Sequence, residues 1–217
     1  MFNISKKMHM HKPDLNEIKN IIFDLGNVIL NLDFNASIKA FQKLGLDKDV
    51  LNRKQAYADP AFYQLEVGEI SPSVFRKRVR QILKNQTATD QEIDDAWYGM
   101  IRDIPSGRVR TLQRLREDYR IFLFSNTNTI HIGRLLPEFK KEHGLDFSSL
   151  FEKTFYSHEI HARKPDMQAF QKVIDLSKVN PSETLFVDDL ERNVVAARET
   201  GLKAFWLKEG MEMSQLF

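Results

Sequence analysis

The sequence predicts an α/β protein: a doubly wound parallel sheet of the Rossmann-like kind, with an all-helical subdomain inserted after its first strand. Three short apolar runs, at 21–23, 121–124 and 185–187, each end at a polar residue. Such runs are typical of strands buried on both faces of a parallel sheet. From residue 105 onward helical and strand patterns alternate, which indicates βαβ crossovers. Between 35 and 100 we find helical patterns and no convincing strand.

The first strand, at 21–23, leads into a turn and then the first helix. Gly26-Asn27 is a turn signal, and the stretch 28–34 can form a small β-flap. Asn35 is expected to be the N-cap of the helix, and Gly45 is expected to stop it.

Further helices are predicted before residue 105. Tyr57, Phe62 and Leu65 mark one helical face. Ser71-Pro72 is an N-cap and first-turn pair that opens another helix, and the apolar positions in 93–101 mark a third. We therefore expect a helical cap at 35–102, a core domain at 19–34 and 103–217, and an N-terminal arm at 1–18.

The second half of the chain supplies the rest of the core. Ser106 is expected to cap a helix that leads to the strand at 121–124, and a short strand follows within 151–156. Pro165 is expected at the first position of the next helix. The strand at 185–187 feeds a helix at about 190–200, which Gly201 closes, and 204–207 is the last strand.

Composition excludes several classes of function. Lys+Arg 32 against Asp+Glu 30 gives a net charge of +2, which implies no nucleic acid or membrane partner, and no obligate protein partner is inferred. The 217 residues contain no cysteine, which excludes disulfides, thiolate metal sites and a Cys nucleophile. No stretch is long and apolar enough for a membrane span, and the first residues lack the apolar region of a signal peptide. We expect a cytoplasmic protein.

Polar side chains follow each of the three apolar runs. Asp24 ends the first, Ser125 the second and Asp188-Asp189 the third, while Lys164 lies in a loop between them. Ligands of open α/β sheets bind beyond the carboxyl ends of the strands, so one crevice is expected to hold all of these groups. A lone Asp, a hydroxyl, a lysine and an acidic pair suit Mg²⁺-assisted phosphoryl chemistry.

Asp24 is the candidate nucleophile, since a carboxylate can attack phosphorus and form an aspartyl-phosphate. A single Asp at a strand end more often caps a turn, but two adjacent carboxylates require a cation or donors. We expect Asp24, Asp189 and the backbone carbonyl of Gly26 to bind Mg²⁺ directly. Asp188 is expected to bind the ion through a water molecule or to lie behind the direct ligands without binding it. Asn193 is placed to steady the acidic cluster.

Ser125, the backbone amides from Asn126 onward, and Lys164 are the candidate phosphate-binding groups, and Ser125 and Lys164 are also assigned to catalysis. A hydroxyl and N–H donors at a strand-to-helix junction can cradle phosphate. Lys164 precedes a proline-initiated helix, so its ammonium group would lie near the positive end of the helix dipole. A cation at that position is unfavourable for the stability of the helix but favourable for binding an anion. A helix cap for Ser125 and a solvated loop lysine remain open as structural alternatives.

The segments 23–28, Ser125-Asn126, Lys164-Pro165 and Asp188-Asp189 resemble, in order and spacing, the four motifs of the haloacid dehalogenase (HAD) superfamily. The resemblance runs from about residue 20 to 207, and the helical insert lies where those enzymes carry their cap. The start of the first motif, Gly68-Glu69-Ile70 and the Ser-Asn-Thr-Asn stretch are similar to bacterial sugar-phosphate phosphatases, including α-D-glucose-1-phosphate phosphatases. The resemblance implies a Mg²⁺-dependent phosphatase that acts on a small phosphorylated metabolite through an aspartyl-phosphate.

The chain departs from that family pattern at Gly26. Most of these phosphatases carry a second Asp there, as the acid that protonates the leaving group, and positioned acid catalysis contributes about 10²–10⁴-fold. Replacement donors could come from the cap or from His158, Glu159 or His161. Substrate specificity is expected from cap side chains, with these candidates: Tyr57, Phe62, Glu66, Arg76 and Trp97.

Several other functions are weighed against this one. A catalytically weak phospho-ligand-binding protein is an alternative that Gly26 motivates. A dehalogenase would lack the paired acids, and a signalling receiver domain would carry its acidic pair on the first strand. A phosphonate hydrolase would need a Schiff-base lysine from the cap, for which the candidates are Lys39, Lys43, Lys54, Lys77 and Lys84.

Overall fold

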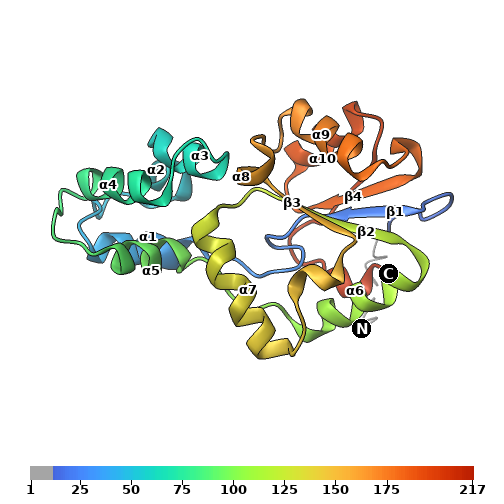
Figure 1. The fold of residues 1–217 in the computed structure, drawn as a ribbon, viewed down its shortest axis with the longest axis horizontal. Helices are drawn as coiled ribbons and strands as arrows, with labels where there is room; N and C mark the ends of the chain where they lie inside the picture. The colour runs from blue at the N-terminus through green and yellow to red at the C-terminus, as the bar shows by residue number, and fades with distance from the viewer. Residues whose placement is uncertain (1–11) are drawn as a thin grey trace, which may run out of the picture.

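The computed structural model describes residues 12–217 (Figure 1), so most of the predicted N-terminal arm lies outside the described residues. At its centre is a five-stranded parallel sheet with the strand order β3-β2-β1-β4-β5. The strands are β1 Asn20–Phe23, β2 Arg120–Ser125, β3 Lys153–Tyr156, β4 Thr184–Asp188 and β5 Lys203–Trp206. The predicted fold class, a doubly wound parallel sheet, is confirmed.

Helices cover both faces of the sheet (Figure 1), which explains why the strands read as continuous apolar runs. On β1, Ile21 and Phe23 face a layer built from α6 (Ser106–Asp118) and α7 (Thr129–His143). Ile22, between them, packs with α9 (Met167–Ser177) and α10 (Glu191–Glu199) on the other face. β1 pairs with β2 and β4, so the ends of all three strands lie side by side.

The remaining helical segments lie before or after the second strand in the chain. Before the second strand they are α1 Phe34–Lys43, α2 Arg53–Ala56, α3 Pro60–Glu66, α4 Pro72–Ile82 and α5 Asp90–Tyr98. After it come α8 Ser157–Ile160 and the 3₁₀ turns η1 Phe147–Leu150, η2 Pro181–Glu183 and η3 Met213–Gln215. No helix within residues 12–217 has the length and apolarity needed to span a bilayer.

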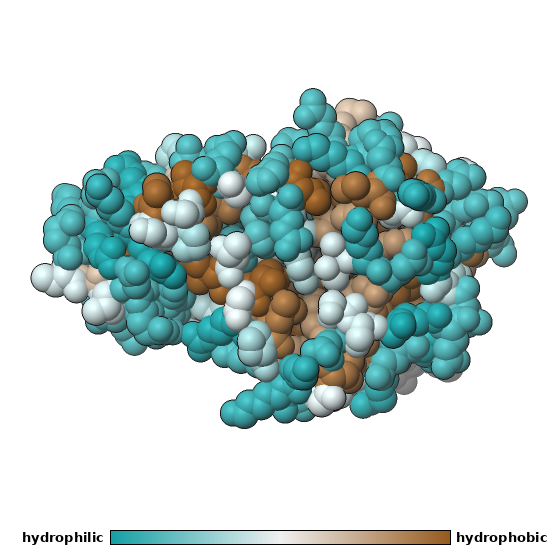
Figure 2. All heavy atoms as spheres, in the orientation of Figure 1, coloured by the Kyte–Doolittle hydropathy of each residue, from teal (hydrophilic) through white to brown (hydrophobic). Residues whose placement is uncertain are grey.

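Helices α1–α5 form a separate body beside the sheet (Figure 1), which we call the cap, and they have their own hydrophobic cluster. Trp97 is at its centre, with ring centroids at 5.0 Å from Phe62, 6.0 Å from Phe75 and 6.5 Å from Phe41. Figure 2 shows a mostly hydrophilic face, with hydrophobic residues reaching the surface in the region between the cap and the sheet.

Two antiparallel chain segments connect the cap to the core. Leu32, entering the cap, forms an isolated bridge with Ile101, leaving it. Backbone bonds extend this pairing from the Arg102 N–H to Asn31 O at 3.0 Å and from the Asp33 N–H to Met100 O at 2.8 Å. In the region of the predicted β-flap at 28–34, the structure therefore has an isolated bridge between Gly26 and Leu30 and a short ribbon made with the returning chain.

Three predicted helix starts are wrong. The N-cap of α1 is Asp33, not Asn35: the Asp33 carboxylate accepts from the Ala36 N–H. Ser106 is the first residue of α6, and Pro105 takes the cap position without a side-chain bond. α9 starts at Met167 rather than Pro165, because a turn closed by the Asp166 N–H on Arg163 O comes first.

The cap helix predicted from Tyr57 to Leu65 is broken in two. α2 ends at Ala56, and a new N-cap follows at Asp59, whose carboxylate accepts from the Ala61 N–H. Pro60 occupies the first helical position of α3, where a missing N–H costs nothing. The predicted Ser71-Pro72 start of α4 is confirmed, with Ser71 Oγ accepting from the Val74 N–H.

Candidate active site

Three carboxylates meet beyond the carboxyl ends of β1 and β4. Asp24 follows the last residue of β1, Asp188 ends β4, and Asp189 comes next. One oxygen from each lies within 4.8 Å of the others. β1 and β4 are neighbours, with Phe23 paired to Val187, and this register brings the predicted acidic residues together.

Lys164 lies beneath this cluster with its side chain 1% exposed. Its Nζ donates to Asp24 Oδ1 at 2.5 Å, Asp188 Oδ2 at 2.8 Å and the carbonyl of Phe124 at 2.8 Å. An ammonium group has three protons, so all of them are used within the protein. The lysine therefore joins the two carboxylates. Its role follows from these contacts rather than from its position before a helix, on which the sequence-based prediction rested.

The two acids of the pair have different surroundings. Asp188 is fully buried and accepts from the Leu190 N–H at 2.8 Å and from Asn193 Nδ2 at 3.0 Å, as expected of Asn193. Asp189 accepts from Asn27 Nδ2 at 3.0 Å. Asn27 has a left-handed φ of 54°, which suits the predicted turn, but no local pattern predicts that its side chain reaches Asp189.

The charges of the cluster are not balanced by the protein alone. Burial raises the pKa of Asp24 to about 7; Lys164 opposes the shift, and Asp188 and Asp189 add to it. Burial likewise raises the pKa of Asp189, and Asp188 adds to the shift against a hydrogen bond from Asn27. Raised pKa values show that the negative charges of these clustered carboxylates are poorly stabilised. A divalent cation, which prefers hard oxygen ligands, would stabilise them.

Ser125 and Asn126 lie at the end of β2, beside Asp24. Ser125 is buried, with 3% of its surface exposed, and it lines the cleft described below. The side chain of Asn126 is occupied: Nδ2 donates to Lys164 O at 2.8 Å and Oδ1 accepts from the Lys164 N–H at 2.9 Å. Asn126 thus fixes the lysine loop, a role the sequence did not suggest.

A cleft of about 530 Å³ opens over these groups, between the core and the cap. Its lining includes Asp24, Ser125 and Lys164 from the core and Tyr57, Glu66 and Trp97 from the cap. Of the candidate Schiff-base lysines, Lys54 lines the cleft and the others do not. The structure thus brings the predicted site residues to one cavity, which the cap closes on one side, except that Asp188 is fully buried and does not line it.

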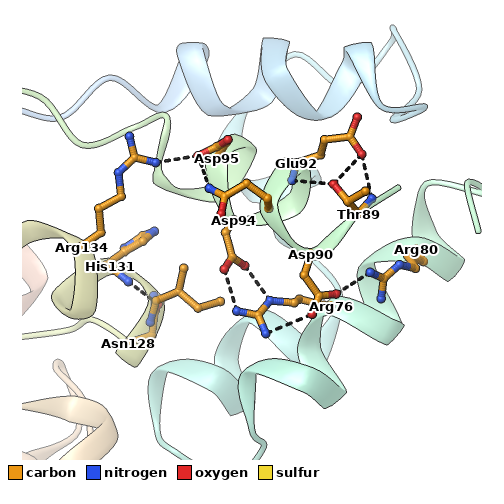
Figure 3. Close-up of polar contacts among 12 residues, drawn as sticks. Arg76, Arg80, Thr89, Asp90, Glu92, Asp94, Asp95, Asn128, His131 and Arg134 are labelled. Carbon is orange, nitrogen blue, oxygen red and sulfur yellow. Dashed lines mark hydrogen bonds and ion pairs between the residues drawn. The ribbon is translucent and has the colours of Figure 1, made fainter. Parts of the chain in front are cut away.

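Arg76, a candidate specificity residue, points away from this cleft. Its guanidinium binds Asp94 Oδ2 at 2.6 Å and reaches Asp90 at 3.5 Å, both on α5 (Figure 3). The same view shows His131 of α7, which does line the cleft and which the sequence analysis missed. Burial lowers the pKa of His131 to about 4, so this ring is neutral at physiological pH.

None of the loop residues considered as replacement proton donors lines the cleft. His158 Nδ1 lies 3.2 Å from Thr127 O, and His161 Nδ1 lies 2.9 Å from the cap carbonyl of Val67. These rings attach α8 to its neighbours, and Glu159 is exposed. Gly26 does line the cleft, close enough that a Cβ there would lie 3.9 Å from Asp24 Oδ2.

Comparisons with known proteins match nearly the whole chain. The family model for haloacid dehalogenase-like hydrolases matches residues 18–201. A D-ribitol-5-phosphate phosphatase of Bacteroides thetaiotaomicron is 34% identical over 200 residues, which cover 91% of this chain and 96% of the relative. Two solved structures are also similar. One is a HAD family enzyme of the same organism in complex with magnesium and inorganic phosphate: 34% identity, TM-score 0.84, 92% of this chain and 99% of that chain. The other is a predicted HAD-like hydrolase of Porphyromonas gingivalis: 32% identity, TM-score 0.77, 89% and 93% coverage.

Proposed function

Because the chain belongs to the haloacid dehalogenase-like hydrolase family, we propose that it is a Mg²⁺-dependent phosphatase of a small phosphorylated metabolite. The observation that carries this proposal is the cluster of Asp24, Asp188 and Asp189 around Lys164, beside a cleft that the cap closes on one side. The ribitol-phosphate phosphatase, similar over most of this chain, supports a sugar or sugar-alcohol phosphate as the substrate. The similar structure in complex with magnesium and inorganic phosphate supports the metal.

The residues present suit Mg²⁺, which prefers hard oxygen ligands. Asp24, Asp189 and the carbonyl of Gly26 would hold the ion, with Asp188 behind them on Lys164 and Asn193. When bound, Mg²⁺ supplies positive charge that offsets the repulsion between the carboxylates and the phosphate. Asp188, fully buried on its own donors, orients Lys164.

Asp24 is proposed as the nucleophile. One of its carboxylate oxygens bonds to phosphorus while the bond from phosphorus to the leaving oxygen breaks, and water then hydrolyses the aspartyl-phosphate. Lys164, 2.5 Å from Asp24 Oδ1, fixes that oxygen so that the other can attack. Ser125 Oγ and the amides from Asn126 onward are proposed to bind the phosphoryl oxygens. Residue 26 offers no side chain to protonate the leaving oxygen.

The proposed division of the chain is a core at 19–34 and 103–217, which carries the chemistry, and a cap at 35–102, which covers it. The paired ribbon at Leu32 and Ile101 supports these limits. We also propose a cytoplasmic location, for which the cysteine-free sequence is suited.

Asp24→Asn tests the assignment of the nucleophile. The amide is nearly isosteric but a very poor nucleophile, so steady-state hydrolysis of p-nitrophenyl phosphate should vanish while the folded protein remains. Wild-type activity should be lost with chelator, return with Mg²⁺ and be inhibited by Ca²⁺, whose looser coordination misplaces the reacting atoms. Retained turnover in D24N, or full wild-type activity after exhaustive chelation, would contradict the proposal.

A further inference from the structure

Glu66, the last residue of α3, brings a carboxylate from the cap into the catalytic cleft. It lines the same cavity as Asp24 and Lys164, and 21% of its side chain is exposed. Its side chain therefore borders the cavity that contains the candidate nucleophile.

The position of Glu66 is fixed from the core. Arg163 Nη1 lies 2.6 Å from Glu66 Oε2, and the hydroxyl of Ser157 donates to the Glu66 carbonyl at 2.6 Å. Arg163 directly precedes Lys164, which binds Asp24. Two consecutive residues of the core thus hold the candidate nucleophile and the cap carboxylate in a fixed relation.

One oxygen of this carboxylate is left without a donor. Oε2 is buried and accepts no hydrogen bond within residues 12–217, although Arg163 Nη1 forms an ion pair with it at 2.6 Å. An ionised carboxylate can only accept hydrogen bonds. Burial raises the pKa of Glu66, with Arg163, Arg53 and Arg192 opposing the shift, so a further donor would stabilise its charged form.

A substrate hydroxyl is a donor that fits this position, whereas a second anionic group is not. We propose that Glu66 is a specificity-determining residue that accepts hydrogen bonds from hydroxyl groups on the carbon chain of the substrate, which makes the preferred substrates polyhydroxylated phosphate monoesters. Arg163 is the positioning residue that keeps Glu66 in place. This inference rests on the proposed phosphatase function and deepens it.

The test compares three phosphate esters that separate hydroxyl recognition from leaving-group chemistry. A five-carbon alditol 5-phosphate and n-pentyl phosphate both release a primary alcohol, but only the first carries further hydroxyls. p-Nitrophenyl phosphate needs little protonation of its leaving group. The quantity compared is the ratio of kcat/KM for the alditol phosphate to kcat/KM for pentyl phosphate.

E66A is expected to lower kcat/KM for the alditol phosphate by roughly 10- to 100-fold, the loss of a hydrogen bond to a charged group, and to change pentyl phosphate by less than about threefold. E66Q, which keeps an amide oxygen as acceptor, should lie between E66A and the wild type. Glu69, an exposed cap residue outside the cleft, provides the matched control: E69A should leave the ratio unchanged.

Arg163 is tested by the same ratio. R163M should lower it because Glu66 loses its partner, and R163K should restore part of it. A purely structural role would reduce turnover of all three esters together and would leave the ratio unchanged.

Binding provides a readout that does not depend on turnover. Calorimetry of the alditol phosphate with D24N and with D24N/E66A should show at least tenfold weaker binding in the double variant. Equal affinities, or equal losses on the alditol and pentyl esters in E66A, would overturn the inference. A loss on both alkyl esters that spares the aryl ester would instead make Glu66 a proton donor and also overturn it, as would a preference for a phosphate ester that carries a carboxylate. Absence of turnover of all three esters by the wild type would contradict the proposed function itself, whereas the calorimetry would still decide the role of Glu66.

Discussion

Replacing Lys164 by methionine should destabilise the metal-free protein and make its stability depend on a divalent cation. The Lys164 ammonium is buried and is the shared partner of Asp24 and Asp188. Methionine fills most of the same volume without a charge, so K164M removes the electrostatic interaction and leaves no large cavity.

The expected loss can be worked from these contacts. Removing one partner of a buried ion pair costs about 3–5 kcal/mol, because the remaining charge stays buried without compensation. In K164M two carboxylates lose the same partner, and the Phe124 carbonyl loses the donor at 2.8 Å. We therefore expect the free energy of unfolding at pH 8 in chelator to fall by about 4 kcal/mol, a large part of the ~5–15 kcal/mol of a typical protein.

The assay is equilibrium unfolding in urea, with chelator and then with excess Mg²⁺. A cation that binds the carboxylates of the folded protein and not the unfolded chain adds stability. In K164M it also offsets the repulsion between Asp24 and Asp188, which have lost their shared partner. The deficit of K164M should therefore be smaller with Mg²⁺. Lys141, exposed on α7, supplies the control, because K141M should change stability by no more than about 0.5 kcal/mol.

The reasoning is refuted if K164M in chelator is as stable as the wild type. A second variant guards against losses that arise from packing alone. Adding Asp188→Asn to K164M removes one of the two unpaired carboxylates and should recover stability at pH 8. If the double variant is less stable than K164M, repulsion between the carboxylates is not the cause.

Two further predictions concern Gly26 and the titration of Asp24. A Cβ at residue 26 would lie 2.6 Å from Leu32 Cδ1, so G26A measures the cost of moving that flexible side chain. Relative to G26A, G26D should raise kcat/KM for alkyl phosphates by tenfold or more and kcat/KM for aryl phosphates much less. Equal effects on both esters would show that the new carboxyl group does not protonate the leaving group. The pKa of Asp24 is raised in the folded state from 3.8 to about 7, so its contribution to stability is greatest below pH 3.8 and is lost as pH rises to 7. In chelator, the wild type should therefore lose about 3 kcal/mol relative to D24N between pH 4 and 7. The comparison with D24N cancels the opposite contribution of His131, and a difference that does not change with pH would contradict the prediction.

The fold and the contents of the site were predictable because the signals are local and strong. Each buried strand is a run of apolar residues, and the residue that ends it lies at the carboxyl edge of the sheet by construction. Local sequence was therefore sufficient to place Asp24, Ser125 and Asp188 at this edge. Their coming together follows from the strand order, which places β1 between β2 and β4.

What the sequence could not predict depends on contacts between distant segments. Asn27 and Asn126 look like turn residues, yet their amides hold Asp189 and the loop of Lys164. α9 starts later than predicted because a turn closed by the Asp166 N–H takes the place of helix at Pro165. Glu66 could be named as a cap candidate, but its pairing with Arg163 spans 97 positions of the chain and has no local signature.

The ribbon at the entrance of the cap makes the cap separable from the rest of the chain. Asn31 and Arg102 are already joined by a backbone hydrogen bond of 3.0 Å, so a polypeptide that skipped everything between them would need only a tight turn. The sheet, its two helical layers and the acidic cluster would keep their sequence intact. A different cap joined at the same two residues would change the molecules that reach the cleft and would leave the acidic cluster in place.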